Sequence, residues 1–333
     1  MRRGGAWLTF LLTGCNGYQN AMGGDGAEGA NFIQLFSVFM VVCTIMYVIV
    51  AAALLFALWR RRSAALVVED RKHHQTSALV RPALFAWTAL IGAGLVALTI
   101  ASFFTDRSNA AEGSKPQLIL TVTANQWWWD VEYNLPDVSR TVRTANEIHL
   151  PVGIPAEVTL KSNDVIHSFW IPNLAGKQDL IPGRQTDAQL LPRKIGLYRG
   201  QCAEFCGTQH AQMALDVTVE SKEDFLRWYA AQLKPAVAPA NPQQHAGYRY
   251  FTTRECASCH NISGTPASGQ VAPDLTHFAS RRSLAAGALP MNRGNVYGWV
   301  ADPQSLKPGS RMPTVGLKAD ELHSLVAYLE TLK

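Results

Sequence analysis

Two cysteines, a histidine and a methionine fall within one stretch of twelve residues: Cys202, Cys206, His210 and Met213. Sulfur and imidazole together suit copper, and one Cys, two His and a weak Met form the blue-copper electron-transfer set. Here two cysteines are spaced so that both sulfurs can face one point. They can therefore bridge two copper ions and delocalise one electron over both. The stretch predicts a two-copper electron-transfer site.

Such a site needs a second imidazole. His167 is the best candidate, because it lies 35 residues before Cys202, a separation that suits a neighbouring loop of a β-sandwich. Two disulfides are the alternative in an oxidising compartment, but the Cys202–Cys206 spacing is awkward for a disulfide on a regular helix. The remaining histidines are interpreted as solvent-facing or structural: His73, His74, His149, His245, His277 and His323.

Another cysteine pair, Cys256 and Cys259, is followed directly by His260. Cys-x2-Cys-His is the attachment sequence for c-type haem, in which both thiols bond to the haem and the histidine binds the iron. A zinc or redox site is disfavoured by the adjacent histidine and by the lack of a further Cys pair. The second axial ligand should be a downstream thioether, for which Met291 and Met312 compete.

Two uncharged stretches are long enough to cross a membrane. The first has 28 residues, Phe32 to Trp59, and the second has 23, Pro82 to Phe104. A helix of ~20 apolar residues spans the ~30 Å hydrocarbon core. We therefore expect transmembrane helices at 31–59 and 82–104.

Positive charge is concentrated in the loop 60–81 between the two stretches, which carries six Lys and Arg residues. Residues 16–31 carry none. The positive-inside rule thus places the loop in the cytoplasm and both flanks, with the whole C-terminal part, outside. The net charge is +5, but no segment is basic enough for a nucleic-acid-binding surface, so nucleic acid is not expected as a partner.

The chain starts with Arg2 and Arg3 before a short apolar stretch that ends in Leu-Thr-Gly-Cys. This is the pattern of a secretory signal at residues 1–15. Its ending resembles a bacterial lipobox, which implies lipidation of Cys15. Residues 16–30 are rich in glycine and are predicted to be a flexible tether.

Three further regions follow the second stretch. Residues 115–232 alternate apolar and polar side chains between Pro and Gly residues, as in a β-sandwich, with a short helix at 222–233. Residues 233–242 form a semi-rigid Pro/Ala linker. Residues 243–333 form a helical domain whose last helix has Leu322, Leu325, Val326 and Leu329 on one face.

The stretch Tyr198 to Gly207, with His210 and Met213, resembles the binuclear copper A motif of cytochrome c oxidase subunit II. The resemblance covers residues 31–232 and includes the aromatic stretch Asn125 to Tyr133 and the stretch Gly176 to Arg184. It implies a cupredoxin-like sandwich. It also implies the copper ligands His167, Cys202, Cys206, His210, Met213 and the backbone carbonyl of Glu204.

The same resemblance implies further roles. The Glu204 carboxylate would bind a magnesium ion shared with subunit I, and Trp129 would be the tryptophan at which the electron arrives. Leu84 stands where many members have a glutamate for proton uptake, which puts that role in doubt. The C-terminal region is similar to small class I cytochromes c, all-α proteins with a loop-Met-Pro-helix order. This similarity favours Met312, and it makes the Pro273 carbonyl the acceptor that fixes the His260 tautomer.

The implied protein is a multidomain membrane protein: a two-helix transmembrane hairpin, a cupredoxin-like β-sandwich and a cytochrome c domain. By resemblance it is subunit II of a respiratory cytochrome c oxidase in the bacterial cytoplasmic membrane, with both soluble domains on the periplasmic face. Covalent haem c would pass electrons to copper A and then to the haem of subunit I, where O2 is reduced to water with proton translocation. Subunit III, membrane lipid and an external cytochrome c or another respiratory complex are the other expected partners.

Three alternatives stay open. A freestanding membrane electron-transfer protein would need neither Glu204 nor the hairpin. A nitrous-oxide-reducing system would need many more than the nine histidines present, and a copper delivery or storage module would need open Met/His-rich tracts. The copper ligands exclude a quinol oxidase. Neither membrane stretch contains a histidine, so the O2 site must lie on another chain.

Overall fold

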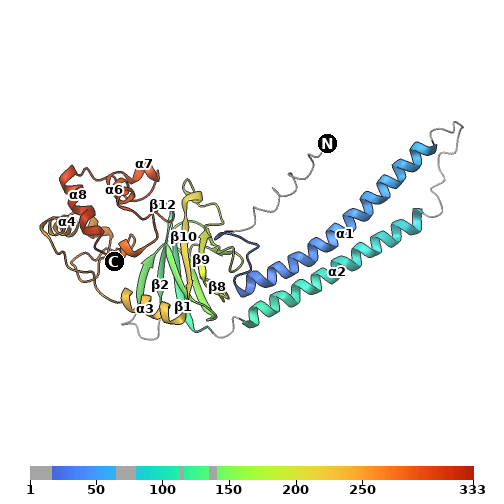
Figure 1. The fold of residues 1–333 in the computed structure, drawn as a ribbon, viewed down its shortest axis with the longest axis horizontal. Coiled ribbons are helices and arrows are strands. Elements are labelled where there is room, and N and C mark those ends of the chain that lie inside the picture. The colour runs from blue at the N-terminus through green and yellow to red at the C-terminus, as the bar shows by residue number, and fades with distance from the viewer. Residues whose placement is uncertain (1–16, 65–79, 113–115, 135–140) are drawn as a thin grey trace, which may run out of the picture. The chain divides into compact units, whose positions relative to one another are not determined.

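A computed structural model describes residues 17–64, 80–112, 116–134 and 141–333 (Figure 1). The described residues divide into two compact units, a helical unit from Asn31 to Ala111 and a second unit formed by the rest. The predicted lipidation site, Cys15, and most of the predicted cytoplasmic loop lie outside the described residues. Each unit is described separately below.

The helical unit consists of α1 (Ala27–Ala64) and α2 (Val80–Glu112). Each is long and apolar enough to cross a membrane, as the uncharged stretches predict, and each extends beyond its predicted bounds at both ends. Most of their large apolar side chains are exposed, among them Tyr47, Leu55 and Phe85. Because water would oppose such exposure, these faces fit a hydrocarbon surrounding.

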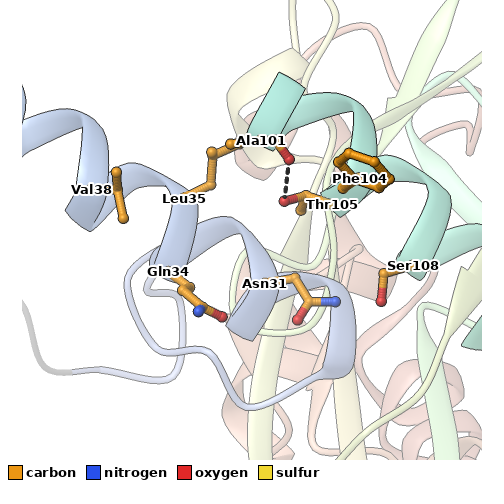
Figure 2. A pocket seen from close by; sticks show the side chains of 8 residues that line it. All are labelled: Asn31, Gln34, Leu35, Val38, Ala101, Phe104, Thr105 and Ser108. Atoms are coloured by element: carbon orange, nitrogen blue, oxygen red, sulfur yellow. Dashed lines mark hydrogen bonds between the residues drawn. The ribbon is translucent and has the colours of Figure 1, made fainter. Parts of the chain in front are cut away.

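Polar side chains cluster at one end of the helix pair, where a cavity of about 300 Å³ lies between α1 and α2. Figure 2 shows Asn31 and Gln34 of α1 and Thr105 and Ser108 of α2 around it. The Asn31 amide donates to Asn109 across the pair at 2.6 Å. In the topology that the charge pattern predicts, this end lies at the outer face of the cytoplasmic membrane, where polar groups can be hydrated.

The sandwich domain, residues 116–232, contains two main sheets and one small one. The first has the strand order β3-β2-β1-β5-β8 and the second has the order β4-β10-β9. The strands of the first sheet are β1 (Leu118–Asn125), β2 (Trp128–Tyr133), β3 (Val142–Ala145), β5 (Ala156–Ser162) and β8 (Thr186–Leu190). The others are β4 (Glu147–Pro151), β9 (Gly196–Gln201) and β10 (Ala214–Glu220), with β6 (His167–Phe169) paired to β7 (Gln178–Leu180).

Alternation along the strands builds the core of this domain. In β1, Leu118, Leu120, Val122 and Ala124 are buried, while the residues between them are less so. Opposite faces of a strand carry alternate residues, so one face of the sheet is apolar. The predicted short helix is confirmed as α3 (Lys222–Gln232), whose Phe225 and Tyr229 pack against the same core.

The prediction of a flexible tether is wrong for residues 17–30. The amides of Asp25 and Gly26 donate to the Asn173 carbonyl at 2.9 and 3.2 Å, and the Asn20 amide donates to the Asn173 side chain at 2.7 Å. A Cβ at Gly26 would lie 2.3 Å from the carbonyl oxygen of Leu174. Glycine is therefore needed here for close approach of two backbones, and the segment is tied to the sandwich domain.

The C-terminal domain, residues 243–333, is helical, as predicted. Its helices are α4 (Pro242–Thr253), α5 (Cys256–Cys259), α6 (Arg293–Ala301), α7 (Pro303–Leu306) and α8 (Ala319–Leu329). A short hairpin of β11 (Ser283–Leu284) and β12 (Leu289–Pro290) precedes α6. The predicted apolar face of α8 is confirmed, because Leu325, Val326 and Leu329 are buried and Tyr328 meets Tyr248 of α4 edge to face.

The linker between these domains packs on the C-terminal domain. The Ala236 amide donates to the Ser263 carbonyl at 3.0 Å, and the His277 ring contacts the Lys234 carbonyl at 3.0 Å. Val237 and Ala238 are exposed. The linker is therefore held at its start and open to solvent in its middle.

Candidate metal and haem sites

His167, Cys202 and Cys206 converge in the sandwich domain, with their ligand atoms within 4.8 Å of one another. His167 starts β6, and both cysteines lie on the loop that follows β9. The chain then makes a 3-10 turn at His210–Gln212 and enters β10 after Met213. The ends of β6, β9 and β10 thus bring His167 close to the cysteine-containing stretch, as predicted.

The distances link all five predicted side chains. The Cys202 and Cys206 sulfurs are 3.8 Å apart, and the Cys202 sulfur is 3.8 Å from Nδ1 of His167. The Cys206 sulfur is 3.5 Å from Nδ1 of His210 and 3.9 Å from the Met213 sulfur. The carbonyl oxygen of Glu204 is 3.3 Å from the Cys202 sulfur.

Backbone hydrogen bonds hold the cysteine loop in this shape. The Cys202 amide donates to the Met213 carbonyl at 2.9 Å, and the Ala203 amide donates to the Ser168 carbonyl at 3.0 Å. The Cys206 carbonyl accepts from the Trp127 indole at 2.9 Å and from the Gln126 side chain at 2.7 Å. The loop is therefore preorganised by the protein itself.

Asp164 orients the buried His167, a role that the sequence did not indicate. Its Oδ1 lies 2.8 Å from Nε2 of His167, so that Nδ1 faces Cys202. A carboxylate on the far ring nitrogen fixes the tautomer that a metal ligand needs. Burial alone would lower the pKa of His167, but Cys202 and Asp164 outweigh it and raise the pKa.

The two thiols titrate as a pair. The pKa of Cys202 is lowered to about 3 by the Cys206 sulfur, against burial and with further help from His167. The pKa of Cys206 is raised by the Cys202 sulfur and by burial. The metal-free pair therefore keeps one thiolate and one thiol, and a cation between them would displace the proton.

The donor set fits copper. Two sulfurs, two imidazoles and a thioether are soft or borderline donors, and His167, Cys202, Cys206 and Met213 are all at most 2% exposed. The described cysteines are free of disulfides. The Glu204 side chain instead meets the exposed Lys177 at 3.3 Å, so its role toward magnesium stays a prediction.

The three consecutive tryptophans have different surroundings. Trp129 is fully buried, with its ring centroid 6.2 Å from that of His167 and its indole N–H without a partner. Trp127 is 8% exposed, and its ring lies against Gly309 of the C-terminal domain. Trp129 therefore lies inside the domain beside a proposed copper ligand, and its role as the residue at which the electron arrives stays a prediction.

The predicted haem residues lie together on the C-terminal domain. Cys256 and Cys259 are on the single turn α5, and His260 caps its end. Nδ1 of His260 is 2.7 Å from the Pro273 carbonyl, which confirms the predicted contact and leaves Nε2 for iron. Burial lowers the pKa of His260, so the ring stays neutral, as a ligand must be.

The two candidate methionines differ in packing. Met291 packs against the apolar core of the C-terminal domain. Met312 lies outside that core in the loop before α8, where the Gln304 side chain donates to its carbonyl at 2.7 Å. The Met312 thioether is therefore the one not already used for packing.

Comparison with known proteins assigns both domains. Residues 135–221 match the model of the cytochrome c oxidase subunit II periplasmic domain, and residues 244–333 match that of cytochrome c. Cytochrome c oxidase subunit 2 of Alkalihalophilus pseudofirmus is 28% identical over 98% of this chain and 95% of its own length. The same subunit of Bacillus sp. (strain PS3) is 32% identical over 68% of this chain and 65% of its own length.

Solved structures are similar to parts of the chain. One of them is the periplasmic domain of subunit II of cytochrome oxidase from Bradyrhizobium japonicum, 30% identical, with a TM-score of 0.34. The similarity covers 36% of this chain and 96% of that one.

Removing one sulfur tests the paired thiols. In Cys206→Ser we expect at most one copper ion per chain, because Cys202, His167 and Met213 can still hold a single ion. The near-infrared mixed-valence band should vanish while the haem spectrum is unchanged. Two coppers and a retained band would show that Cys206 is not a bridge.

The axial haem ligand is tested by comparing Met312→Ala with Met291→Ala. Loss of the iron-bound thioether should lower the haem potential and abolish the weak sulfur–iron absorption band. Met291→Ala should instead lower stability by about 0.5–3 kcal/mol, because it removes a partly buried side chain that packs against the core. The opposite pattern would reassign the ligand to Met291.

Proposed function

Because the chain belongs to the cytochrome c oxidase subunit II family and carries a cytochrome c domain, we propose that it passes electrons from a covalent haem c to a binuclear copper A centre. From there electrons go to the haem of subunit I, where O2 is reduced to water and protons are translocated. Membership of the family makes the chain part of an oxidoreductase complex with a catalytic subunit. The two apolar helices and the match to a periplasmic domain indicate a membrane protein with periplasmic domains.

The observation that carries the proposal is the pair of buried sulfurs 3.8 Å apart, each with an imidazole nitrogen within 3.8 Å. When bound there, two copper ions would supply one-electron redox chemistry. The surrounding residues hold the ligands in a fixed geometry. Asp164 holds His167 at a fixed angle, and the hydrogen-bonded loop keeps both thiols in place, so little rearrangement would accompany a change of charge.

The haem residues support the other half of the proposal. Cys256 and Cys259 lie on one turn, as two covalent attachments to one ring require, and Pro273 orients His260. The haem-binding and copper-binding segments are in one chain, so transfer between them needs no diffusion. An external cytochrome c or another respiratory complex would supply electrons to the haem.

Copper delivery or storage is disfavoured by burial. A protein that hands metal to a partner must expose its ligands, whereas four of these ligand side chains are at most 2% exposed. The Glu204 carboxylate is exposed, so the proposed magnesium ion at a subunit I interface could reach it, but the ion would have to displace Lys177. Subunit III is proposed as a further partner on family resemblance alone.

Metal and haem analysis tests the proposed function. The purified full chain in detergent should contain two coppers per covalent haem, and the haem should stay attached on a denaturing gel. The physical reason is that thioether bonds survive denaturation while axial ligation does not. One copper per haem, or haem lost on denaturation, would refute the proposal.

The route of the electron is tested by Trp127→Phe and Trp129→Phe. The family resemblance implies that the electron arrives at Trp129. The geometry favours Trp127 instead, because its ring contacts both Gly309 and the Cys206 carbonyl. We expect Trp127→Phe to slow haem-to-copper transfer after flash reduction more than Trp129→Phe does. Because a tether supplies the haem at a roughly millimolar effective concentration, the rate must be measured rather than an affinity.

Unchanged copper spectra in both variants are the control for this comparison. If Trp129→Phe is the slower variant, the electron arrives at Trp129 as the resemblance implies. If neither variant is slowed, Trp128 is the next residue to change.

A further inference from the structure

Lys307, in the loop after α7, is 2% exposed. Its ammonium group donates to three backbone carbonyls, each at 2.8 Å: those of Trp127, Gln212 and Ala285. An ammonium has three N–H donors, so all of them are used by neutral oxygens. The proposed electron transfer leaves this buried cation without a role.

The three acceptors come from both domains. Trp127 and Gln212 belong to the sandwich domain, whereas Ala285, like Lys307 itself, belongs to the C-terminal domain. A buried ammonium is costly unless its donors are satisfied, and burial lowers the pKa of Lys307 to about 7. The full set of acceptors exists only when the two domains are in contact in this one arrangement.

The residues after Lys307 also bind the sandwich domain. The Gln209 side chain donates to the Pro308 carbonyl at 2.8 Å, and the Arg311 guanidinium is 3.2 Å from the Asp164 carboxylate. Gly309 has a φ of +85°, and a Cβ there would lie 3.4 Å from the Trp127 ring. A glycine is therefore suited to this position both by its backbone and by the close ring.

This loop ends at Met312, the proposed axial ligand. Its contacts are with residues that are adjacent or hydrogen-bonded to the proposed copper ligands. Trp127 donates to the Cys206 carbonyl, Gln212 precedes Met213, and Asp164 orients His167. One loop of six residues thus joins the immediate surroundings of both proposed redox centres.

We propose that Lys307 is a positioning residue that fixes the loop 307–312 of the C-terminal domain against the copper-ligand segments of the sandwich domain. It thereby sets the distance over which the electron is transferred, without touching haem or copper. The proposal rests on the proposed function for its effect on rate, but the docking of the two domains is independent of bound metal.

The test uses Lys307→Met, which keeps the length of the side chain and removes its donors. Lys318→Met is the matched control, because Lys318 is an exposed lysine of the same domain. All variants carry a protease site inserted after Ala238, in the exposed middle of the linker. After cleavage, the C-terminal fragment should co-elute with the rest of the chain in the parent and in Lys318→Met, and should be released from Lys307→Met.

The second readout is the rate of haem-to-copper transfer in the uncleaved chain. Because the rate of electron transfer falls steeply with the distance between the two centres, Lys307→Met should transfer electrons more than twofold more slowly than the parent. The haem and copper spectra should be unchanged. If Lys307→Met fails to fold, Arg311→Gln is used in its place, because Arg311 is exposed. This variant should also retain less of the fragment than the parent does.

Two results would overturn the proposal. One is retention of the fragment by Lys307→Met together with a transfer rate within twofold of the parent, and the other is release of the fragment from the parent itself. The cleavage readout is repeated after copper is removed by a chelator. Loss of copper or haem from the parent would refute the proposed function, whereas the metal-free cleavage result bears on Lys307 alone.

Discussion

The sulfur atoms of Cys202 and Cys206 lie 3.8 Å apart in a part of the molecule that water does not reach. Two thiolates at that distance would repel each other strongly in a medium of low dielectric constant. The metal-free site therefore holds one proton between them, and a bound cation can take its place. The hydrogen bonds of the surrounding loop keep this pair in one geometry.

The Cys206 carbonyl connects the pair to the rest of the fold. It accepts from Trp127 and Gln126, and the Trp127 carbonyl in turn accepts from Lys307. These hydrogen bonds thus link a proposed metal ligand to the domain that carries the proposed haem-binding residues. The acceptors are backbone carbonyls, which every residue supplies, but the donors are the side chains of Trp127, Gln126 and Lys307, so the connection depends on these three residues.

The sequence predicts those parts of the site that depend on residue type and local spacing. Both cysteine pairs and the apolar face of α8 follow in this way, since each is a short pattern with one chemical use. The Pro273–His260 contact instead came from the resemblance to class I cytochromes c. Asp164 and Lys307 were missed, because an acid and a lysine in loops give no local sign that they are buried. Their roles exist only through tertiary contacts.

Residues 17–30 illustrate a different limit. Glycine serves both flexible segments and segments in which two backbones approach closely, and composition alone does not separate these uses. At Gly26 the carbonyl of Leu174 takes the space that a side chain would need. The same ambiguity would have affected Gly309, whose neighbour is the Trp127 ring.

The linker favours a docked C-terminal domain over one that swings between partners. A tether raises the effective concentration of a domain whether or not it docks, so a long, free linker would be enough for repeated encounters. Here Lys234 and Ala236 are instead bonded to the C-terminal domain, which shortens the free tether. Movement of the domain would have to break these contacts as well as the buried bonds of Lys307. If the C-terminal domain is the electron donor, as proposed, its covalent link therefore does more than raise its concentration, because the contacts also orient it.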